Sequence, residues 1–156
     1  MTDADAIHIR AAATADLPGV LALYAQPGMD DGRVLPIQDA EHIFARFARY
    51  PDYTLYVAEA DRQIVGSFAL LIMDNLGHLG AHSAIVEDVV VDPALHGNGV
   101  DQTMMRFAMA RAREKRCYKL VLSSNAKRER AHAFYESLGF ERHGFSFRVA
   151  VEGTPA

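Results

Sequence analysis

The chain has 156 residues, of which 50% are hydrophobic and 23% charged, and its formal net charge at pH 7 is −4. This size and composition are typical of a globular protein, and we predict a single domain over residues 1–156. The acidic balance argues against nucleic acid as the main partner, no apolar run is long enough for a membrane span, and the single cysteine, Cys117, fits a reducing, cytoplasmic compartment.

The first half of the chain has the pattern of a short strand, two helices and a hairpin. In chain order we predict a strand over 7–10, a helix over 16–24, a loop over 26–36, a helix over 39–49, hairpin strands over 53–59 and 63–73, and a loop over 74–80. Asp16 is a candidate N-cap, and Pro18 fits the first turn of its helix.

The second half alternates strands and helices. We predict strands over 83–91 and 119–123, helices over 100–115 and 128–138, and two closing strands over 140–141 and 145–151. Gly139 fits the position that ends the last helix. The helix over 100–115 turns four residues inward: Met104, Phe107, Ala108 and Ala112. This order predicts an α/β (α+β) fold with a mixed central sheet of about seven strands and helices on both faces.

The segment from Val89 to Gln102, VVVDPALHGNGVDQ, is the most informative part of the chain. A β-branched strand leads into a glycine-rich turn, and an amphipathic helix follows. Unpaired backbone N–H groups at a helix N-terminus favour an anion, and glycine lets the backbone approach a ligand closely. The pattern indicates a phosphate site, although an ordinary turn has the same composition.

Three segments together resemble the GCN5-related N-acetyltransferase (GNAT) superfamily, and the likeness covers nearly the whole length. They are EDVVVDPALHGNGV (Glu87 to Val100), CYKLVLSSN (Cys117 to Asn125) and AHAFYESLGF (Ala131 to Phe140). The first is similar to the family's acetyl-CoA motif, the second to the next strand, and the third to the helix with a tyrosine. The resemblance implies a GNAT fold, with strands splayed at a cofactor cleft, and an acetyl-CoA-dependent N-acetyltransferase.

The resemblance also implies where the cofactor binds. The pantetheine arm would pair with the backbone of Val89 and Val91, the pyrophosphate would lie over the glycine turn, and Asn125 would lie beside the arm. Tyr135 matches the family's general acid. The implied cofactor-binding residues are Val89, Val90, Val91, His96, Gly97, Asn98, Gly99, Val100, Asp101, Gln102, Asn125 and Tyr135.

The general base is left open by the sequence. Simple alternation along the strand places Glu87 on one face with Val89 and Val91 and aims it at the cleft, while Asp88 points to the other face. A solvated strand carboxylate is an equal interpretation of Glu87. Alternative bases are the histidines ahead of the strand, His78 and His82. No group of residues has the spacing of metal ligands, so no metal is predicted.

Two positions depart from the family pattern. His96 stands where the pattern has Arg or Gln, and it can still donate a hydrogen bond to phosphate. Asp101 stands where the pattern has a small residue. A carboxylate about 4–5 Å from a diphosphate charge would oppose it by about 3–4 kcal/mol at an effective dielectric constant near 20. Either CoA binds with a shifted diphosphate or weaker affinity, or the fold has lost its cofactor.

The acceptor is predicted to be a primary amine on a small molecule, similar to an amino sugar or an aminoalkylphosphonate. Acidic loop residues that could hold an ammonium group are Asp30, Asp31 and Asp74, and basic residues that could face an anionic group are Lys127, Arg128 and Arg130. Attack would be direct, within a ternary complex. The alternatives are a binding or regulatory module of the same fold and an enzyme that acetylates protein or peptide amines. The resemblance also allows a homodimer.

Overall fold

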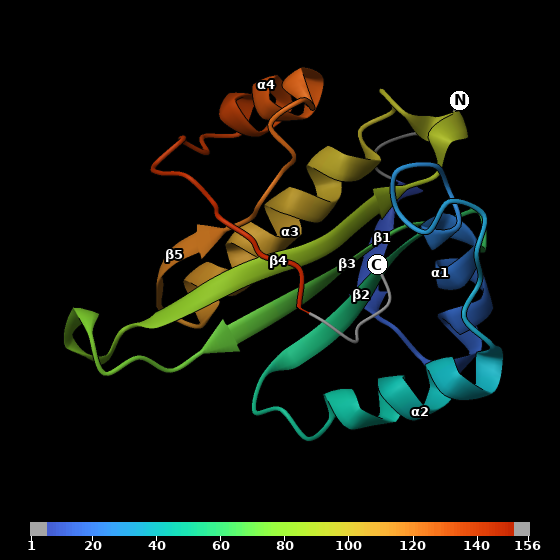
Figure 1. Cartoon of the computed structure of the whole chain (residues 1–156), viewed down its shortest axis with the longest axis horizontal. Helices are drawn as coiled ribbons and strands as arrows, with labels where there is room; N and C mark the ends of the chain where they lie inside the picture. Colours follow the sequence, from blue (N-terminus) through green and yellow to red (C-terminus); the bar gives the residue numbers. More distant parts are fainter. Residues whose placement is uncertain (1–5, 152–156) are drawn as a thin grey trace. The chain divides into compact units, whose positions relative to one another are not determined.

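The structure is a computed structural model that describes residues 6–151, and these form two compact units, one ending at Leu122 and the next beginning at Ser123. The elements of the first unit are β1 (His8–Ala11), α1 (Leu17–Tyr24), α2 (Ile37–Phe47), β2 (Tyr53–Ala60), β3 (Gln63–Met73), β4 (His82–Val91), α3 (Val100–Glu114) and β5 (Cys117–Val121) (Figure 1). The second unit contains α4 (Glu129–Ser137).

A mixed sheet forms the centre of the first unit. Its strand order is β1-β2-β3-β4-β5, and every pair is antiparallel except β4 with β5, which is parallel. The predicted hairpin is confirmed: Asp61 and Arg62 join β2 to β3 with φ angles of 49° and 63°. Positive φ at both residues of a two-residue loop matches the right-handed twist of the flanking strands.

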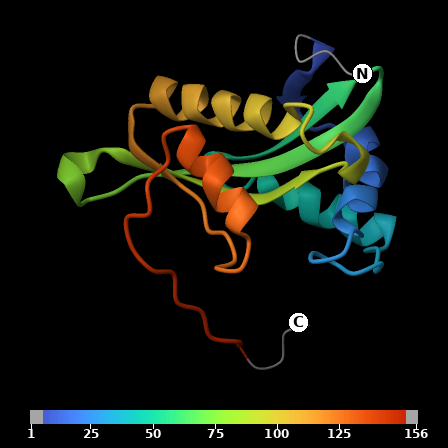
Figure 2. The same cartoon turned by 90° about the horizontal axis from the view of Figure 1, so that it is seen from above.

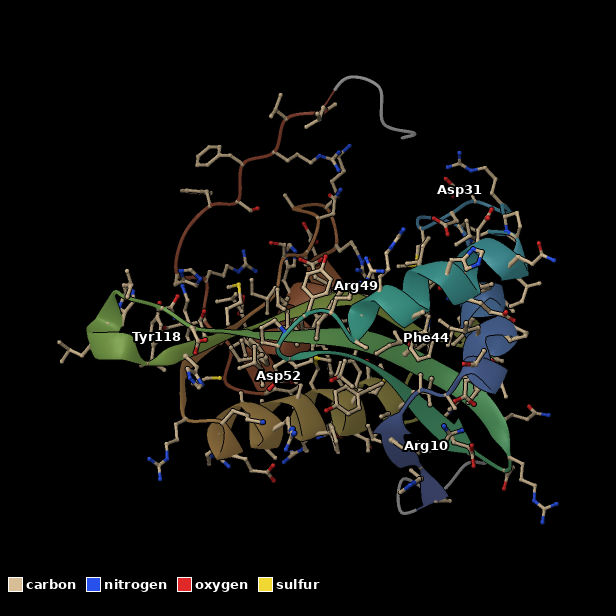
Figure 3. All side chains as sticks on the ribbon, turned by 90° about the horizontal axis from the view of Figure 1, so that it is seen from below. Arg10, Asp31, Phe44, Arg49, Asp52 and Tyr118 are labelled. Atoms are coloured by element: carbon tan, nitrogen blue, oxygen red, sulfur yellow. The ribbon has the colours of Figure 1, made fainter. Side chains whose placement is uncertain are left out.

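Helices cover both faces of this sheet, as predicted (Figures 1 and 2). On one face, α1 and α2 close over side chains of β2 and β3. The buried residues of that cluster are Leu17, Val20, Leu21, Ala40, Leu55, Val57 and Ala69, and Phe44 of α2 packs against them (Figure 3). On the other face α3 lies so close that a Cβ added to Gly66 would be 2.9 Å from the sulfur of Met104.

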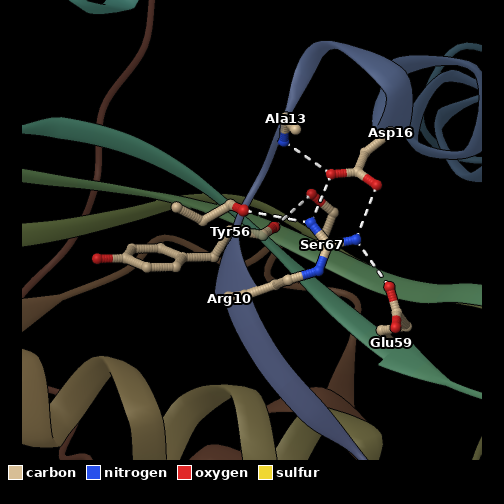
Figure 4. Close-up of polar contacts among 7 residues, drawn as sticks. Arg10, Ala13, Asp16, Tyr56, Glu59 and Ser67 are labelled. Carbon is tan, nitrogen blue, oxygen red and sulfur yellow. Dashed lines mark hydrogen bonds and ion pairs between the residues drawn. The ribbon is translucent and has the colours of Figure 1, made fainter.

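An ion-pair network ties β1 to the chain ahead of α1. Arg10 donates to both carboxylate oxygens of Asp16, at 2.7 and 2.9 Å, and to Glu59 of β2 at 2.7 Å (Figure 4). The Asp16 carboxylate also accepts from the backbone N–H of Ala13, and the Arg10 partner lowers its pKa. Asp16 therefore does not cap α1 with its side chain, because this carboxylate faces back along the chain.

The two predicted closing strands are wrong: within residues 138–151 no strand forms, and the described sheet has five strands instead of about seven. Helix α4 ends as predicted, with Gly139 at φ 99° and the N–H of Phe140 bonded to the carbonyl of Tyr135. The residues that follow run as an extended trace without a strand arrow (Figure 2). Apolar alternation predicts which side chains share a face, but a strand also needs a neighbouring edge for its backbone groups.

Candidate functional site

The C-terminal half of β4 has an open edge on the side of β5. Parallel pairing between the two strands ends at Ile85 with Val121, whereas β4 continues to Val91 (Figure 1). No strand among residues 6–151 pairs with that side of β4 beyond Ile85. The backbone groups on this edge can therefore receive an extended ligand in the way that a sheet edge receives an added strand.

A β-bulge interrupts β4 beside this edge. Glu87 pairs with Ala69 and Val90 with Ser67, so three steps on β4 match two steps on β3, and the bulge residue Asp88 has a φ of 52°. The predicted sharing of one face by Glu87, Val89 and Val91 is therefore wrong. The inserted residue reverses the alternation, so that Glu87 shares its face with Val90, while Val91 lies on the other face, toward α3.

Carboxylates and phenols gather on the face of the sheet that α1 and α2 cover. Loss of hydration raises the pKa of Asp88, and the negative charge of Asp30 raises it further. Burial, followed by the charge of Asp88, raises the pKa of both Tyr24 and Tyr53, and Glu87 adds to the effect on Tyr53. The carboxylates of this cluster are groups that can accept a proton.

The predicted glycine turn forms where β4 leads into α3. Gly97 and Gly99 have φ angles of 83° and 82°, a left-handed conformation that side chains with a Cβ rarely adopt. Gly99 directly precedes the first residue of α3, and its carbonyl accepts from both the N–H and the hydroxyl of Thr103. The first N–H groups of an α-helix have no acceptor within the helix, so the start of α3 can offer such groups to an anion.

The Asp101 carboxylate already accepts a hydrogen bond from one of those N–H groups. Its Oδ1 accepts a hydrogen bond of 2.8 Å from the backbone N–H of Gln102. The side chain thus places a negative charge at the N-terminus of α3, where it complements the helix dipole. An incoming diphosphate would compete with this carboxylate for the same donor.

Three candidate site residues lie at the opposite end of β4 from the glycine turn: Asp74, His78 and His82. His82 begins β4, its Nε2 is 3.0 Å from Asp74, and its Nδ1 is 3.0 Å from the carbonyl oxygen of Lys115. His78 lies in the connection between β3 and β4 and stacks on Tyr118 of β5, which Figure 3 labels near this connection. Because β4 has 10 residues at about 3.3 Å each, about 30 Å separates this end from the glycine turn.

The second unit has its own local order. The Asn125 side chain accepts from the N–H of Lys127 at 2.9 Å, which closes the turn before α4. Tyr135 is half-buried in α4, with its ring centroid 5.3 Å from that of Phe134 and 5.8 Å from that of Phe140. The Ser124 hydroxyl is buried and, among the described side chains, lacks a hydrogen-bond partner. An orphaned hydroxyl next to Asn125 suits a polar ligand atom.

Two surface hollows of the described structure lie away from the glycine turn. One is lined by α2 and β2, including Phe44, Phe47 and Tyr53, and another by α1 and the two residues that follow β4. Neither is lined by the glycine turn. Within residues 6–151 no group of three His, Cys, Asp or Glu side chains could hold a metal ion. No helix in the same range is long and apolar enough to cross a bilayer.

The sequence model of the acetyltransferase (GNAT) family matches residues 20–140. The chain belongs to this family. Its enzyme class is therefore acyltransferase, and members of the family use acetyl-CoA as co-substrate. The predicted resemblance and fold class are confirmed.

Individual relatives agree with this assignment. Glucosamine 6-phosphate N-acetyltransferase of Trypanosoma brucei brucei is 37% identical over 56% of this chain, and the chain spans 57% of that relative. Aminoalkylphosphonate N-acetyltransferase of Salmonella typhimurium is 27% identical over 92% of this chain and 91% of its own length. A solved structure from Agrobacterium tumefaciens strain C58, whose name proposes an acetyltransferase, has a TM-score of 0.85 and 34% identity over 92% of this chain and 99% of its own.

Proposed function

We propose that this GNAT protein transfers an acetyl group from acetyl-CoA to a primary amine on a small molecule. The observation that carries the proposal is the continuity of two features. The open edge of β4 ends at Val91, and the glycine turn before α3 follows within a few residues. An extended arm on the edge would bring its phosphate groups to the N-terminus of α3.

The acidic pair at the bulge is our proposed proton acceptor. Glu87 faces the cluster of Tyr24 and Tyr53, and the raised pKa of Asp88 makes its carboxylate a stronger base than an ordinary aspartate. In the proposed step the amine nitrogen attacks the thioester carbonyl, the C–N bond forms as the C–S bond breaks, and a carboxylate takes the amine proton. Tyr135 would protonate the departing thiolate, a role that rests on its match to the family motif.

The proposed acceptor class is an amine that also carries a phosphate or phosphonate group. Two relatives whose names give their substrates act on molecules of this kind. The acidic cluster around Asp88 suits the ammonium end of such a molecule before it loses its proton. Three exposed basic residues near the start of α4 carry the charge that an anionic group attracts: Lys127, Arg128 and Arg130.

The two compact units belong, in this proposal, to one domain, because the family match runs from residue 20 to residue 140 across their boundary. The free cysteine at the start of β5, Cys117, supports a reducing compartment such as the cytoplasm. Burial, followed by the charge of Asp52, raises the pKa of this thiol, which disfavours the thiolate that a covalent acetyl intermediate would need. Direct transfer in a ternary complex is therefore our proposed mechanism.

A second candidate function is a non-catalytic module with the same fold. It is favoured by the carboxylate of Asp101, which already accepts from an N–H group at the start of α3. If this charge excludes the diphosphate, the protein keeps the fold without the co-substrate.

The deciding experiment is a calorimetric titration with acetyl-CoA at moderate salt, followed by an assay of thiol release on a panel of amines. The panel contains glucosamine 6-phosphate, glucosamine, an aminoalkylphosphonate, the matching alkylamine and a peptide with a free N-terminus. We expect micromolar binding of acetyl-CoA and faster turnover of each phosphorylated or phosphonylated amine than of its uncharged counterpart.

The other outcomes are equally informative. No binding up to millimolar acetyl-CoA would leave the non-catalytic module as the better account. Binding with turnover of the peptide alone would contradict the small-molecule acceptor. Equal turnover of the paired amines would contradict an anionic group on the acceptor and would still support acetyl transfer to a small amine.

A further inference from the structure

The last residue of β4 offers its carbonyl group to the open edge. The N–H of Asp92 donates to the carbonyl of Val65 in β3 at 2.8 Å. In a trans peptide the C=O and the N–H point in opposite directions, so the carbonyl of Val91, which belongs to the same peptide unit, points away from β3. That direction is toward the open edge, because pairing with β5 ends at Ile85. Val91 therefore provides the last outward carbonyl of β4 before the glycine turn.

A side chain from outside the sheet already donates to this carbonyl. Gln26 follows the end of α1, and α1 lies beside the C-terminal end of β4 (Figures 1 and 2). The Nε2 of Gln26 donates to the carbonyl of Leu23 at 2.8 Å and to that of Val91 at 3.2 Å. A side-chain amide has two N–H donors, so these two carbonyls use both of them. The bond to Val91 is the longer of the two, so a donor at the ideal distance replaces it more readily.

We propose that Gln26 competes with acetyl-CoA for the Val91 carbonyl and releases it when the co-substrate binds. An arm that pairs with the edge as an added strand needs this carbonyl as an acceptor. The inference rests on the proposed function, because it takes the open edge as the place of the arm. On the other side of the glycine turn, Asp101 likewise accepts from the N–H of Gln102. Both sides of the turn thus carry an internal contact that the co-substrate has to replace.

The contact with Val91 can break without unfolding the connection after α1. Backbone hydrogen bonds hold that connection: the N–H of Asp30 donates to the carbonyl of Tyr24 at 3.0 Å, and the N–H of Gly32 to that of Ala25 at 2.7 Å. Neither bond uses the side chain of Gln26. This side chain is half-buried, so water can reach its amide once it is released. Substitutions at Gln26 therefore test binding more than folding.

The test is a calorimetric comparison of four full-length proteins: the unchanged protein, Gln26→Met, Gln26→Ala and Gln63→Met. Methionine keeps roughly the length of the side chain and removes both N–H donors. Alanine also removes the rest of the side chain, in case the methionine itself covers the edge. The control Gln63→Met changes an exposed glutamine at the start of β3. Each protein is titrated with acetyl-CoA and separately with ADP, which has a diphosphate but no arm, and thermal unfolding shows that each variant folds.

We expect both Gln26 variants to bind acetyl-CoA about three- to tenfold more tightly than the unchanged protein, the range that one hydrogen bond gives. Their affinity for ADP and both affinities of Gln63→Met should stay the same. Nuclear magnetic resonance adds a direct readout. The side-chain amide signal of Gln26, identified by its absence from Gln26→Met, should shift when acetyl-CoA is added and stay in place when ADP is added.

Several results would overturn the proposal. Equal affinities for acetyl-CoA would show that the Val91 carbonyl accepts from Gln26 and from the co-substrate together. Weaker binding by the Gln26 variants would show that this residue prepares the edge for the arm, and equal tightening toward ADP would show an effect unrelated to the arm. In these cases the unchanged protein still binds acetyl-CoA, so the proposed function stands. No binding by any of the four proteins would overturn the proposed function and this inference together, whereas binding by the Gln26 variants alone would support both.

Discussion

Asp101 is the residue whose charge bears most directly on co-substrate binding. Its carboxylate lies in the first turn of α3 and accepts from the N–H of Gln102 at 2.8 Å. The same charge that stabilises the helix N-terminus opposes a diphosphate at that place. Half-exposure of the side chain means that solvent weakens this repulsion well below its value in a dry site.

Replacing Asp101 by Asn isolates the charge, because an amide oxygen can still accept from Gln102. We expect Asp101→Asn to tighten acetyl-CoA binding about tenfold, which corresponds to about 1.4 kcal/mol, as measured by calorimetry. The matched control is Asp39→Asn, which removes the first-turn carboxylate of α2. Equal affinities for the Asp101 variant and the unchanged protein would show that this carboxylate turns away from the diphosphate.

At the scale of elements, the contact between β3 and α3 holds the glycine turn in place. Gly66 of β3 pairs with Val91, the last residue of β4, and packs against Val100, the first residue of α3. A Cβ at this position would lie 3.0 Å from a Val100 methyl group and 3.2 Å from the carbonyl oxygen of Val90. Because Gly66 has no side chain, β3 can pack closely against the residues on both sides of the glycine turn, the end of β4 and the start of α3.

We expect Gly66→Ala to lower the free energy of unfolding by about 1–3 kcal/mol, because crowding in a packed core forces its neighbours to shift. The shift falls on both ends of the glycine turn, so acetyl-CoA affinity should fall as well. Gly77→Ala is the matched control, since its added Cβ meets no atom within 4 Å, and its stability should stay within about 0.5 kcal/mol. Urea unfolding measures the first effect and calorimetry the second. An unchanged Gly66→Ala variant would contradict the tight contact.

At the scale of the whole molecule, the proposed chemistry draws on both compact units. The bulge of β4 and the glycine turn belong to the first unit, and Tyr135 belongs to the second. Tyr135 packs against Phe134 and Phe140 within its own unit, so its ring has a structural role there as well. Removal of the hydroxyl alone separates the two roles.

Tyr135→Phe keeps the ring and removes the proton donor. We expect turnover to fall at least tenfold, in line with the usual contribution of a general acid, with no change in acetyl-CoA affinity or in melting temperature. Tyr118→Phe, at an exposed tyrosine of β5, should leave turnover unchanged. Turnover of Tyr135→Phe at the level of the unchanged protein would exclude this tyrosine as the acid.

The sequence by itself determined the features that are local. The order of strands and helices up to α4, the hairpin at Asp61 and Arg62, the glycine turn and the C-terminal cap at Gly139 follow from periodicity and turn chemistry, which neighbouring residues decide. The family motifs also lie in continuous segments.

Only the tertiary structure decided the features that depend on pairing between distant segments. One inserted residue at Asp88 reversed the faces of β4, and that bulge is visible only in the register with β3. The cluster of Asp30 with Asp88, and the separation of His82 from the glycine turn, likewise depend on long-range packing. The alternation in residues 145–151 predicted a strand, but a strand forms only where a partner edge is present.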